Sequence, residues 1–396
     1  MKKILIVSHA LELGGAERSL IGLLDAIDKK EYKVDLFLLR HEGELLSFIP
    51  EGVNLLPEIP AYTVLACPMV QTLKEGHVIL TAARMYGKVK ADKYIKKCGY
   101  TDSGVPLEYS HKYTYRFMPE IQPDEEYDLA ISFLTPHYIV TNKVRAKKKI
   151  AWIHTDYSKV QINEKSELEM WSAYDQISIS DDVTKTFQKI FPTLSTKIIK
   201  IENIIPEKLI ISQSKEFIPV EEMPDDSIKI LSIGRYCTAK NFDNVPNICK
   251  HLVKQGMNVR WYLIGFGPDE NLIKEKIKEE HMEKNVIMLG KKSNPYPYIC
   301  RCDLYVQPSR YEGKCVSVKE AQMLGKPVVI TNYATAGSQL KDGVDGKIVS
   351  LDNKECAKML AELLENVNEI QKYKKNCHES NFSNTVEVQK IYKMMV

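Results

Sequence analysis

The sequence lacks three patterns that would each point to a class of protein. No run approaches the roughly 18 to 20 apolar residues that cross a bilayer, so we expect no membrane-spanning helix. No D-x-D pair of acids occurs, which removes a common way of holding Mg²⁺. The nine cysteines include a C-x-C at Cys300 and Cys302 but no spacing typical of zinc sites. We therefore expect no metal and a reduced, cytoplasmic setting.

An excess of charge of one sign is also missing. Lys and Arg number 55 against 52 Asp and Glu, a net charge of +3, which argues against a nucleic-acid partner. The first apolar stretch, Ile4 to Val7, is broken by Ser8, His9 and Glu12, so it predicts a buried strand and not a signal peptide. Hydrophobic residues at 44% and charged residues at 27% are typical of a globular protein.

The chain of 396 residues is too long for one ordinary core, and two domains are expected. Strand-like runs alternate with helical runs, the pattern of α/β domains with parallel sheets. We predict an N-terminal Rossmann-like domain over 1–205, a second over 206–384 after a Pro- and Ser-containing linker at 206–227, and a last helix, 385–396, that returns to the first domain. The expected strands are Ile4–Ser8, Val34–Leu38, Val53–Leu55, Leu129–Phe133, Ile150–His154, Ile177–Ser180, Lys197–Ile201, Ile228–Ile233, Val259–Ile264, Val286–Leu289, Leu304–Gln307, Val328–Thr331 and Lys347–Val349.

Residues 60–125 depart from this alternation. They are first helical and basic, then aromatic and irregular, and an insertion of this kind often carries specificity. Two basic groups would each suit an anionic membrane surface or form a solvated face. The first lies in this insertion and comprises Arg84, Lys88, Lys90, Lys93, Lys96 and Lys97. The second comprises Lys143, Arg145, Lys147, Lys148 and Lys149.

Two acids stand out in the second half. Glu312 follows the strand Leu304–Gln307 at a strand-to-helix turn, and Glu320 lies in the helix expected over Val318–Leu324. Ligands bind at the carboxyl ends of strands in open α/β sheets, and a helix N-terminus favours phosphate. Acids for hydroxyl groups beside a phosphate site are typical of a nucleotide-sugar pocket.

Four other groups follow strands and are weighed against simple turn or loop roles. Gly14-Gly15 would let the backbone approach a ligand. Arg235 and Lys240 on one loop would neutralise a diphosphate without a metal. His154 ends a strand and would face a cleft between the domains. Gly265-Phe266-Gly267-Pro268 lacks the third glycine of a dinucleotide fingerprint, and we interpret it as a structural turn.

In their order and spacing these residues resemble the retaining glycosyltransferases of family 4. The resemblance covers nearly the whole chain and is strongest from Ile228 to Val349. Two departures are Lys314-Cys315, which puts the preference for the donor sugar in doubt, and Ser338-Gln339, where the family often has Glu. The motifs that carry the resemblance are Gly14-Gly15-Ala16-Glu17, Gly234-Arg235 with Lys240, Gly265-Phe266-Gly267, Pro308-Ser309, Glu312 with Glu320, Gly325-Lys326-Pro327-Val328-Val329 and Asp342-Gly343-Val344-Asp345-Gly346.

The resemblance implies the GT-B fold, with two Rossmann-like domains whose parallel sheets face a central cleft. The first domain would bind the acceptor and the second a nucleotide-sugar donor, most often a UDP- or GDP-sugar, with no cofactor and no metal. The implied roles are diphosphate binding and leaving-group stabilisation by Arg235 and Lys240, ribose binding by Glu320, contact with the donor sugar by Glu312, approach of the Gly14 and Gly15 amides to the diphosphate, and a position near the anomeric carbon for His154.

The acceptor is left open by the residues. Enzymes of this pattern often build surface polysaccharides on glycan or lipid-linked acceptors, so we expect transfer in the cytoplasm with peripheral contact at the inner membrane face. Two alternatives stay open: another GT-B enzyme, such as a nucleotide-sugar epimerase or a glycan phosphorylase, and a non-catalytic subunit that binds sugar nucleotides.

Overall fold

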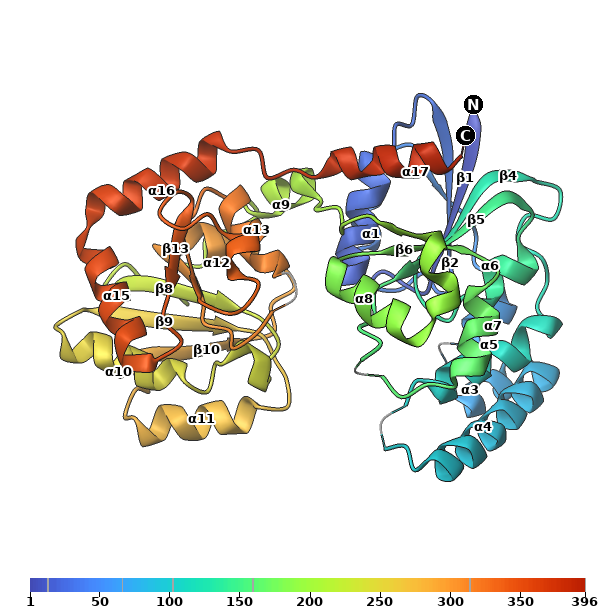
Figure 1. Ribbon diagram of the computed structural model, residues 1–396, viewed down its shortest axis with the longest axis horizontal. Helices are drawn as coiled ribbons and strands as arrows, with labels where there is room; N and C mark the ends of the chain where they lie inside the picture. Colours follow the sequence, from blue (N-terminus) through green and yellow to red (C-terminus); the bar gives the residue numbers. More distant parts are fainter. Residues whose placement is uncertain (13, 66, 102, 159, 313–314, 396) are drawn as a thin grey trace. The chain divides into compact units, whose positions relative to one another are not determined.

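The computed structural model describes residues 1–396 except 13, 66, 102, 159, 313–314 and 396. The chain divides into two compact units (Figure 1). Unit 1 comprises Met1–Pro206 with Asn384–Val396, and unit 2 comprises Glu207–Ser383. The division after Pro206 lies one residue beyond the boundary expected from the sequence.

Unit 1 contains a sheet of seven parallel strands in the order β3-β2-β1-β4-β5-β6-β7. Its central strands are buried on both faces, which explains why they appear in the sequence as continuous apolar runs instead of alternating ones. All of the strands expected here are confirmed, with ends that differ by a few residues. They are β1 (Lys2–Ser8), β2 (Tyr32–Leu38), β3 (Val53–Leu55), β4 (Tyr127–Ser132), β5 (Ala146–Ile153), β6 (Asp175–Ser178) and β7 (Ile198–Lys200).

The helices of unit 1 fall into crossover helices and an insertion. One side of α1 is apolar and buried, with Leu20, Leu23, Leu24 and the C-cap residue Ile27 at most 1% exposed. The elements are α1 (Gly15–Ala26), η1 (Leu46–Phe48), α6 (Tyr138–Lys143), α7 (Glu164–Trp171), α8 (Asp181–Ile190) and η3 (Pro192–Lys197), with the insertion formed by α2 (Pro60–Thr63), α3 (Met69–Lys74), α4 (Val78–Cys98), α5 (Val105–Thr114) and η2 (Tyr115–Phe117).

The insertion is held together by close packing of α4 on α5. A Cβ atom at Gly87 of α4 would lie 2.8 Å from the carbonyl oxygen of Tyr109 on α5, so glycine is what permits the contact. The Arg84 guanidinium turns inward and donates to the carbonyl oxygen of Cys67 at 2.7 Å and to the Thr72 hydroxyl at 3.1 Å. Arg84 therefore does not belong to the exposed basic face expected for this helix.

Unit 2 repeats the architecture with six parallel strands in the order β10-β9-β8-β11-β12-β13 and helices on both sides (Figure 1). The strands are β8 (Ile228–Ile233), β9 (Val259–Ile264), β10 (Val286–Gly290), β11 (Leu304–Gln307), β12 (Val328–Thr331) and β13 (Gly346–Val349). The helices are α9 (Glu207–Gln213), η4 (Thr238–Lys240), α10 (Val245–Lys254), α11 (Glu270–Glu279), α12 (Tyr296–Arg301), α13 (Val316–Met323), α14 (Ala336–Gln339), α15 (Asn353–Glu365) and α16 (Val367–Glu379).

Two details differ from the sequence expectation. The stretch 206–227, expected as a linker, contains the helix α9, whose Leu209 and Ile210 are buried, so part of it is integral to unit 2. The helix carrying Glu320 begins at Val316, earlier than expected, because the Cys315 backbone is extended and the helical turn follows it directly.

The end of the chain packs on unit 1 through η5 (Thr385–Glu387) and α17 (Val388–Met394). The Tyr392 ring stacks on Tyr32 with centroids 4.3 Å apart, and its hydroxyl accepts from the Asp28 amide at 2.8 Å. The Asn384 side chain accepts from the Ile205 amide at 3.0 Å. These contacts bring the last helix to the domain to which it was expected to return.

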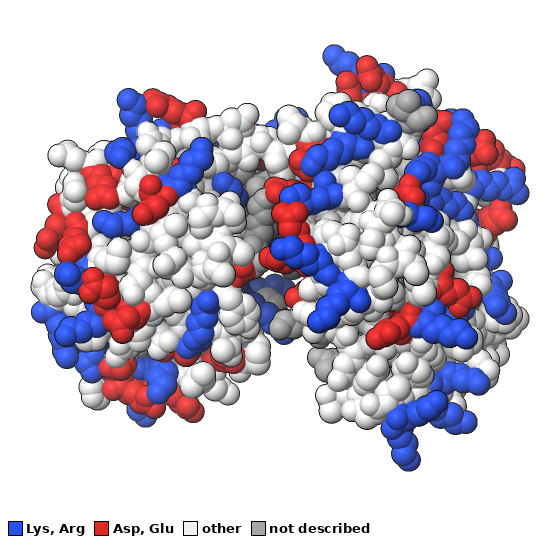
Figure 2. Space-filling view, viewed as in Figure 1, with Lys and Arg blue, Asp and Glu red and all other residues white. Residues whose placement is uncertain are grey.

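Charges of both signs are present on the visible face of the molecule (Figure 2). Figure 2 shows basic and acidic side chains interspersed on the visible face, as the near-balanced composition indicates. Among the described helices, none is long and apolar enough to cross a bilayer.

Candidate functional site

In unit 2, polar side chains gather where β8 and β11 end. Both strands are parallel and paired side by side, so their carboxyl ends lie at one edge of the sheet. The chain leaves β8 through Gly234-Arg235 and the short turn η4, and it leaves β11 through Pro308-Ser309. The sequence therefore places Lys240 and Glu312 on adjacent loops although 72 positions separate them.

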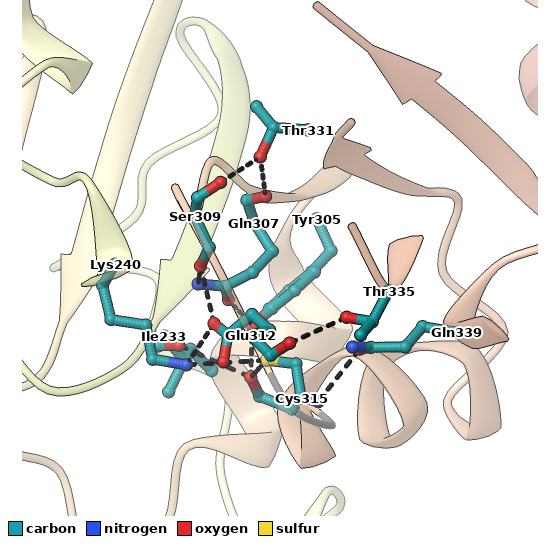
Figure 3. Close-up of polar contacts among 11 residues, drawn as sticks. Ile233, Lys240, Tyr305, Gln307, Ser309, Glu312, Cys315, Thr331, Thr335 and Gln339 are labelled. Carbon is teal, nitrogen blue, oxygen red and sulfur yellow. Dashed lines mark hydrogen bonds and ion pairs between the residues drawn. The ribbon is translucent and has the colours of Figure 1, made fainter. Parts of the chain in front are cut away.

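Lys240 and Glu312 form an ion pair at this edge, with Nζ 2.6 Å from Oε1 (Figure 3). The same carboxylate oxygen accepts from the Ser309 hydroxyl at 2.6 Å, and the Glu312 carbonyl oxygen accepts from the Thr335 hydroxyl at 2.7 Å. Only 17% and 11% of the two side chains are exposed. Burial opposes the charge on Lys240, but the neighbouring Cys315 and Glu312 hold its pKa above the ordinary value. Lys240 is therefore charged, and these contacts fix both side chains in position.

A chain of hydrogen bonds supports this pair from the sheet (Figure 3). The Tyr305 hydroxyl donates to the side-chain oxygen Oε1 of Gln307 at 3.0 Å. The side-chain nitrogen Nε2 of Gln307 donates to the Ser309 hydroxyl at 3.0 Å. Ser309 in turn donates to Glu312. Tyr305 and Gln307 are residues of β11, a central strand of the sheet. They therefore hold the Glu312 carboxylate in a fixed position through Ser309.

A second set of contacts ties the two loops together. The Arg310 guanidinium meets the Asp243 carboxylate through two bonds of 2.8 and 2.7 Å, and the Arg310 amide donates to the Ala239 carbonyl oxygen at 2.8 Å. Asn241 adopts the left-handed conformation at φ 62°, which asparagine tolerates, and its amide donates to the Pro308 carbonyl oxygen at 2.8 Å. The loop carrying Lys240 is thus preorganised against the loop carrying Glu312.

Cys315 and Gln339 account for the departures from the family pattern that the structure describes. Burial raises the pKa of the Cys315 thiol, whose sulfur lies 3.7 Å from Lys240 Nζ. The Gln339 side chain accepts from the Cys315 amide at 2.9 Å, just before the first turn of α13. A neutral amide here caps backbone where the family often has an acid. Lys314, the other departure, lies outside the described residues, as does Gly313.

Arg235 and Glu320 differ in their surroundings. Arg235 is exposed, and it forms no ion pair or hydrogen bond with another residue of the described part of the chain. Glu320 is 3% exposed and accepts from the Tyr296 hydroxyl at 2.8 Å. The structure thus joins Lys240 with Glu312, leaves Arg235 facing solvent, and buries Glu320 against α12.

The glycines after β9 have the structural role expected for them. A Cβ atom at Gly265 would lie 1.9 Å from the Gly234 carbonyl oxygen, and one at Gly267 would lie 2.3 Å from that of Tyr236. These glycines let the turn after β9 pack on the loop that carries Arg235.

In unit 1, Gly14 and Gly15 begin α1 directly after the turn that follows β1. Gly14 is the N-cap, and a Cβ atom there would lie 2.0 Å from the Glu17 carboxylate, which folds back over the helix start. Gly15 has open space around its Cα. Burial raises the pKa of Glu17 at this position. Glu17 could move aside for a side chain at position 14, and Gly15 leaves the backbone open to a ligand.

His154 follows β5 and is partly buried, with its ring centroid 4.7 Å from that of Phe133 and 6.4 Å from that of Trp152. Burial lowers its pKa to about 4, so the imidazole is neutral near pH 7. Its Nε2 atom is buried and has no hydrogen-bond partner among the described residues.

Sequence reasoning missed three further histidines with the same properties. His9 follows β1, His137 follows β4, and His111 lies on α5 with its ring 5.4 Å from that of His9. Burial lowers the pKa of His9 to about 4 and those of His111 and His137 well below the ordinary value. Each has one buried ring nitrogen without a partner in the described part of the chain. The only available signal was that two of them follow expected strands.

No three His, Cys, Asp or Glu side chains of the described residues come together in a way that would hold a metal ion. The cations of the unit 2 cluster are the groups there that attract anions. Lys240 has further N–H donors beyond the one given to Glu312, and Arg235 presents a planar guanidinium. This arrangement suits a ligand that carries phosphate beside hydroxyl groups.

Residues 213–380 match the family model described as Glycosyl transferases group 1. The matched segment lies within unit 2 and contains every residue of the cluster described there. It represents less than half of the chain.

Curated relatives give the same indication over shorter stretches. The chain is 29% identical over 136 residues to an uncharacterized 41.2 kDa protein in the cps region of Klebsiella pneumoniae, covering 33% of this chain and 35% of the relative. It is 28% identical over 135 residues to the poly(glycerol-phosphate) alpha-glucosyltransferase of Bacillus subtilis, covering 34% and 20%. The chain therefore matches about a third or less of the length of these relatives.

Solved structures match over the whole chain. A complex of Anabaena Alr3699/HepE with UDP and glucose gives a TM-score of 0.63 at 16% identity, covering 100% of this chain and 99% of that one. A mutant of S. aureus TarM in complex with fondaparinux, alpha-GlcNAc-glycerol and UDP gives 0.66 at 14% identity, covering 100% of both. At these identities the likeness shows the fold, and the GT-B fold class with its two Rossmann-like parallel sheets is confirmed.

Proposed function

We propose that the protein is a retaining glycosyltransferase of family 4 that moves a sugar from a nucleotide diphosphate sugar to a hydroxyl group of a glycan or lipid-linked acceptor. The observation that carries the proposal is the Lys240–Glu312 network at the carboxyl ends of β8 and β11, inside the segment that matches the family model. Relatives named as an amylovoran biosynthesis glycosyltransferase and as glycosyltransferases of poly(glycerol-phosphate) and poly(ribitol-phosphate) support a role in synthesis of a cell-surface polymer.

The donor contacts are assigned within unit 2. Arg235 and Lys240 bind the diphosphate and stabilise it as it leaves, without a metal ion or other cofactor. Glu320 binds the ribose hydroxyls, and Glu312 contacts the donor sugar. In solved structures of similar fold, HepE is described with UDP-glucose, which supports a uridine nucleotide donor.

The charges around Arg235 and Lys240 give these two cations different roles in binding the diphosphate. Glu312 neutralises Lys240 in the ligand-free protein, so Arg235 supplies the uncompensated positive charge that first attracts the diphosphate. Lys240 then adds a short, charge-assisted bond from a position already fixed by Glu312. Because Glu312 holds Lys240 in place before the ligand arrives, Lys240 reorganises little as charge develops on the leaving diphosphate.

In unit 1, the residues assigned to ligand contact are Gly14, Gly15 and His154. The neutral His154 imidazole suits a hydroxyl group and not an anion, because burial disfavours its charged form. Retention follows if the acceptor hydroxyl attacks on the face that the nucleotide leaves. A diphosphate oxygen then takes the hydroxyl proton, so no protein nucleophile is required, and the rate enhancement comes from positioning and electrostatics.

The proposal is tested by screening UDP-, GDP- and ADP-sugars for thermal stabilisation, because a ligand that binds only the folded state raises the melting temperature. The stabilising sugar is then supplied with acceptor oligosaccharides, and NMR of the product gives the configuration of the new bond. We expect stabilisation by one nucleotide series and retention of the donor configuration. An inverted product, an altered donor without transfer, or no stabilisation by any sugar nucleotide would contradict the proposal.

A further inference from the structure

The insertion of unit 1 exposes an unusual amount of apolar surface. Large hydrophobic side chains on neighbouring helices are between 45% and 67% exposed, where most such residues of the unit are buried. They are Val70 and Leu73 on α3, and Val78, Ile79, Met85, Tyr86 and Val89 on α4. A patch of this kind on a globular protein commonly marks an interaction site.

The opposite face of α4 already has its packing partner. Leu80, Gly87 and Ala91 are buried, and Ala91 packs in a small cluster with Val105 and Tyr109 of α5. The exposed hydrophobic residues of α4 are thus on a different side of the helix from the residues that pack on α5. They form a second apolar face that no described segment covers.

The same exposed face becomes basic in the last turns of α4. Val78, Met85, Val89, Lys93 and Lys96 follow one another at spacings of three, four or seven, so they lie on one side of the helix. Lys90 and Lys97 are exposed beside them, and the acids of α4 number one, Asp92. The surface in the α4 region, at the lower right of Figure 2, shows basic and uncharged atoms without acidic ones on the visible face.

The second basic group of the sequence does not share this property. Lys147 lies 2.8 Å from Asp128, Arg145 pairs with Glu120 at 3.4 Å, and Lys148 pairs with Asp175. Lys149 turns to the Thr141 carbonyl oxygen at 2.8 Å. Three of its cations are thus paired with acids, which leaves this group less free positive charge than α4 has.

We propose that the exposed face of α3 and α4 docks on a lipid bilayer rich in anionic headgroups. The apolar part, Val78 to Val89, enters the boundary between headgroups and acyl chains, while Lys90, Lys93, Lys96 and Lys97 stay at the phosphates. An interfacial helix combines an apolar face with lysines in this way. A second copy of the chain fits less well, because this surface offers almost no acid to pair with the partner's lysines. The docking goes beyond the proposed transfer reaction and does not depend on it.

Co-sedimentation with vesicles tests the docking without any substrate. The full chain is mixed with phosphatidylcholine vesicles containing about one third phosphatidylglycerol, at about 0.1 M and about 1 M salt, where the Debye length falls from about 10 Å to about 3 Å. We expect binding at low salt and weaker binding at high salt. The triple variant Lys93→Glu, Lys96→Glu, Lys97→Glu should bind more than about 100-fold less tightly, since each lysine near the surface contributes roughly fivefold. Its matched control, with the same change in charge, replaces three exposed lysines of unit 2, Lys254, Lys278 and Lys284, and should bind as the wild type does.

Fluorescence reports whether the apolar part enters the bilayer. The natural tryptophans are at most 1% exposed, so brominated lipids should not quench their fluorescence. A tryptophan placed at Val89, which is 45% exposed, can therefore be followed by its quenching. Brominated lipids should quench Val89→Trp and should leave Leu351→Trp, at a position of unit 2 that is 44% exposed, unquenched. Ile79→Ser with Val89→Ser should lower the affinity about tenfold at either salt concentration.

Three results would each overturn the docking proposal. The first is no sedimentation with anionic vesicles at low salt. The second is equal loss of binding in the α4 triple variant and in its control. The third is a homodimer, measured by analytical ultracentrifugation, that Ile79→Ser with Val89→Ser dissociates in the absence of lipid, because the face would then belong to a second copy of the chain.

Discussion

The two units place different chemistry at equivalent points of one topology. In each sheet the chain order reverses beside the first strand, between β1 and β4 in unit 1 and between β8 and β11 in unit 2. His9 and His137 follow the first pair of strands, whereas Arg235 and Glu312 follow the second. The fold thus fixes where ligand-facing side chains lie, and the residues themselves fix which ligand they suit.

Electrostatics separates the two sets. In unit 2 the ion pair of Lys240 and Glu312 is largely buried, and the carboxylate also accepts a hydrogen bond from Ser309. In unit 1 burial keeps the imidazoles of His9, His137 and His154 neutral, and each retains a ring nitrogen without a partner among the described residues. A charged, preorganised edge favours phosphate, while neutral imidazoles favour hydroxyl groups. The comparison therefore agrees with a donor diphosphate bound by unit 2.

Removing the charged centre of unit 2 should have the largest effect. Lys240→Ala should lower kcat/KM about 100- to 1,000-fold, because a preorganised cation no longer meets the leaving diphosphate. It should also destabilise folding by about 3 kcal/mol, since Glu312 is then a largely buried carboxylate without its cation. Steady-state kinetics and chemical denaturation measure the two effects.

Two further variants separate binding of the ligand from support of the fold. Lys240→Ala combined with Glu312→Gln should regain most of the stability and none of the activity, because no unpaired charge is left. Arg235→Ala should leave unfolding unchanged, since the side chain is exposed and unpaired in the described structure, and should still lower kcat/KM. An Arg235→Ala enzyme with wild-type kcat/KM would remove Arg235 from the site.

Unit 1 should lose stability at low pH because of its neutral, buried imidazoles. The folded-state pKa of His9, about 4, lies below the unfolded value of 6.5, so the unfolded state binds more protons between these values. Stability is therefore fully present above pH 6.5 and is lost as the pH falls toward 4, by about 2 kcal/mol at about pH 5 for this group alone. His9→Asn should flatten the dependence of the unfolding free energy on pH.

The measurement needs a signal from unit 1 and a control in unit 2. With Trp261→Phe as background, fluorescence reports Trp152 and Trp171 of unit 1 during denaturant titrations at several pH values. His281→Asn, at an exposed position of unit 2, should leave the pH dependence unchanged. Equal slopes for His9→Asn and the wild type would mean that His9 is protonated in the folded protein. The ring of His111 faces His9, so it is the neighbour to replace next.

The same contrast explains how much the sequence could predict. Strands such as Ile228–Ile233, Val259–Ile264 and Leu304–Gln307 have the ends that were expected, because buried parallel strands appear as bounded apolar runs. Lys240 and Glu312 were visible as charged residues after such strands. Their pairing was not, because it depends on the contact of two loops far apart in the sequence.

Burial explains what was missed. The environment of a histidine is not visible in the sequence, so the neutral set of His9, His111 and His137 emerges only when the ends of β1 and β4 come together with α5. Arg84 was expected on a basic face because it lies in a basic run. In the structure its guanidinium instead donates to the Cys67 carbonyl oxygen inside the insertion.

A smaller effect should separate the two acids of unit 2. Glu320→Gln should raise the KM for the donor roughly tenfold, because the ribose is bound similarly throughout the reaction. Glu312→Gln should instead lower kcat roughly tenfold, since Glu312 acts where charge develops. Glu312→Gln should also bind free UDP more tightly, as Lys240 loses the carboxylate that neutralises it. Identical kinetic changes in the two variants would contradict this division of roles, and weaker UDP binding by Glu312→Gln would contradict the charge argument.

Removal of divalent metal should have no effect on donor binding. The sequence has no D-x-D pair, and the charges at the edge of the unit 2 sheet that are available to a diphosphate belong to Lys240 and Arg235. Calorimetric titration with the stabilising nucleotide sugar in excess EDTA should give the same affinity as titration with Mg²⁺ or Mn²⁺. Repeating both titrations with Lys240→Ala is the sharper control, because a protein that relies on its own cations should lose affinity equally with and without the metal. An affinity that EDTA abolishes and Mg²⁺ restores in the wild type would mean that these two side chains do not neutralise the diphosphate alone.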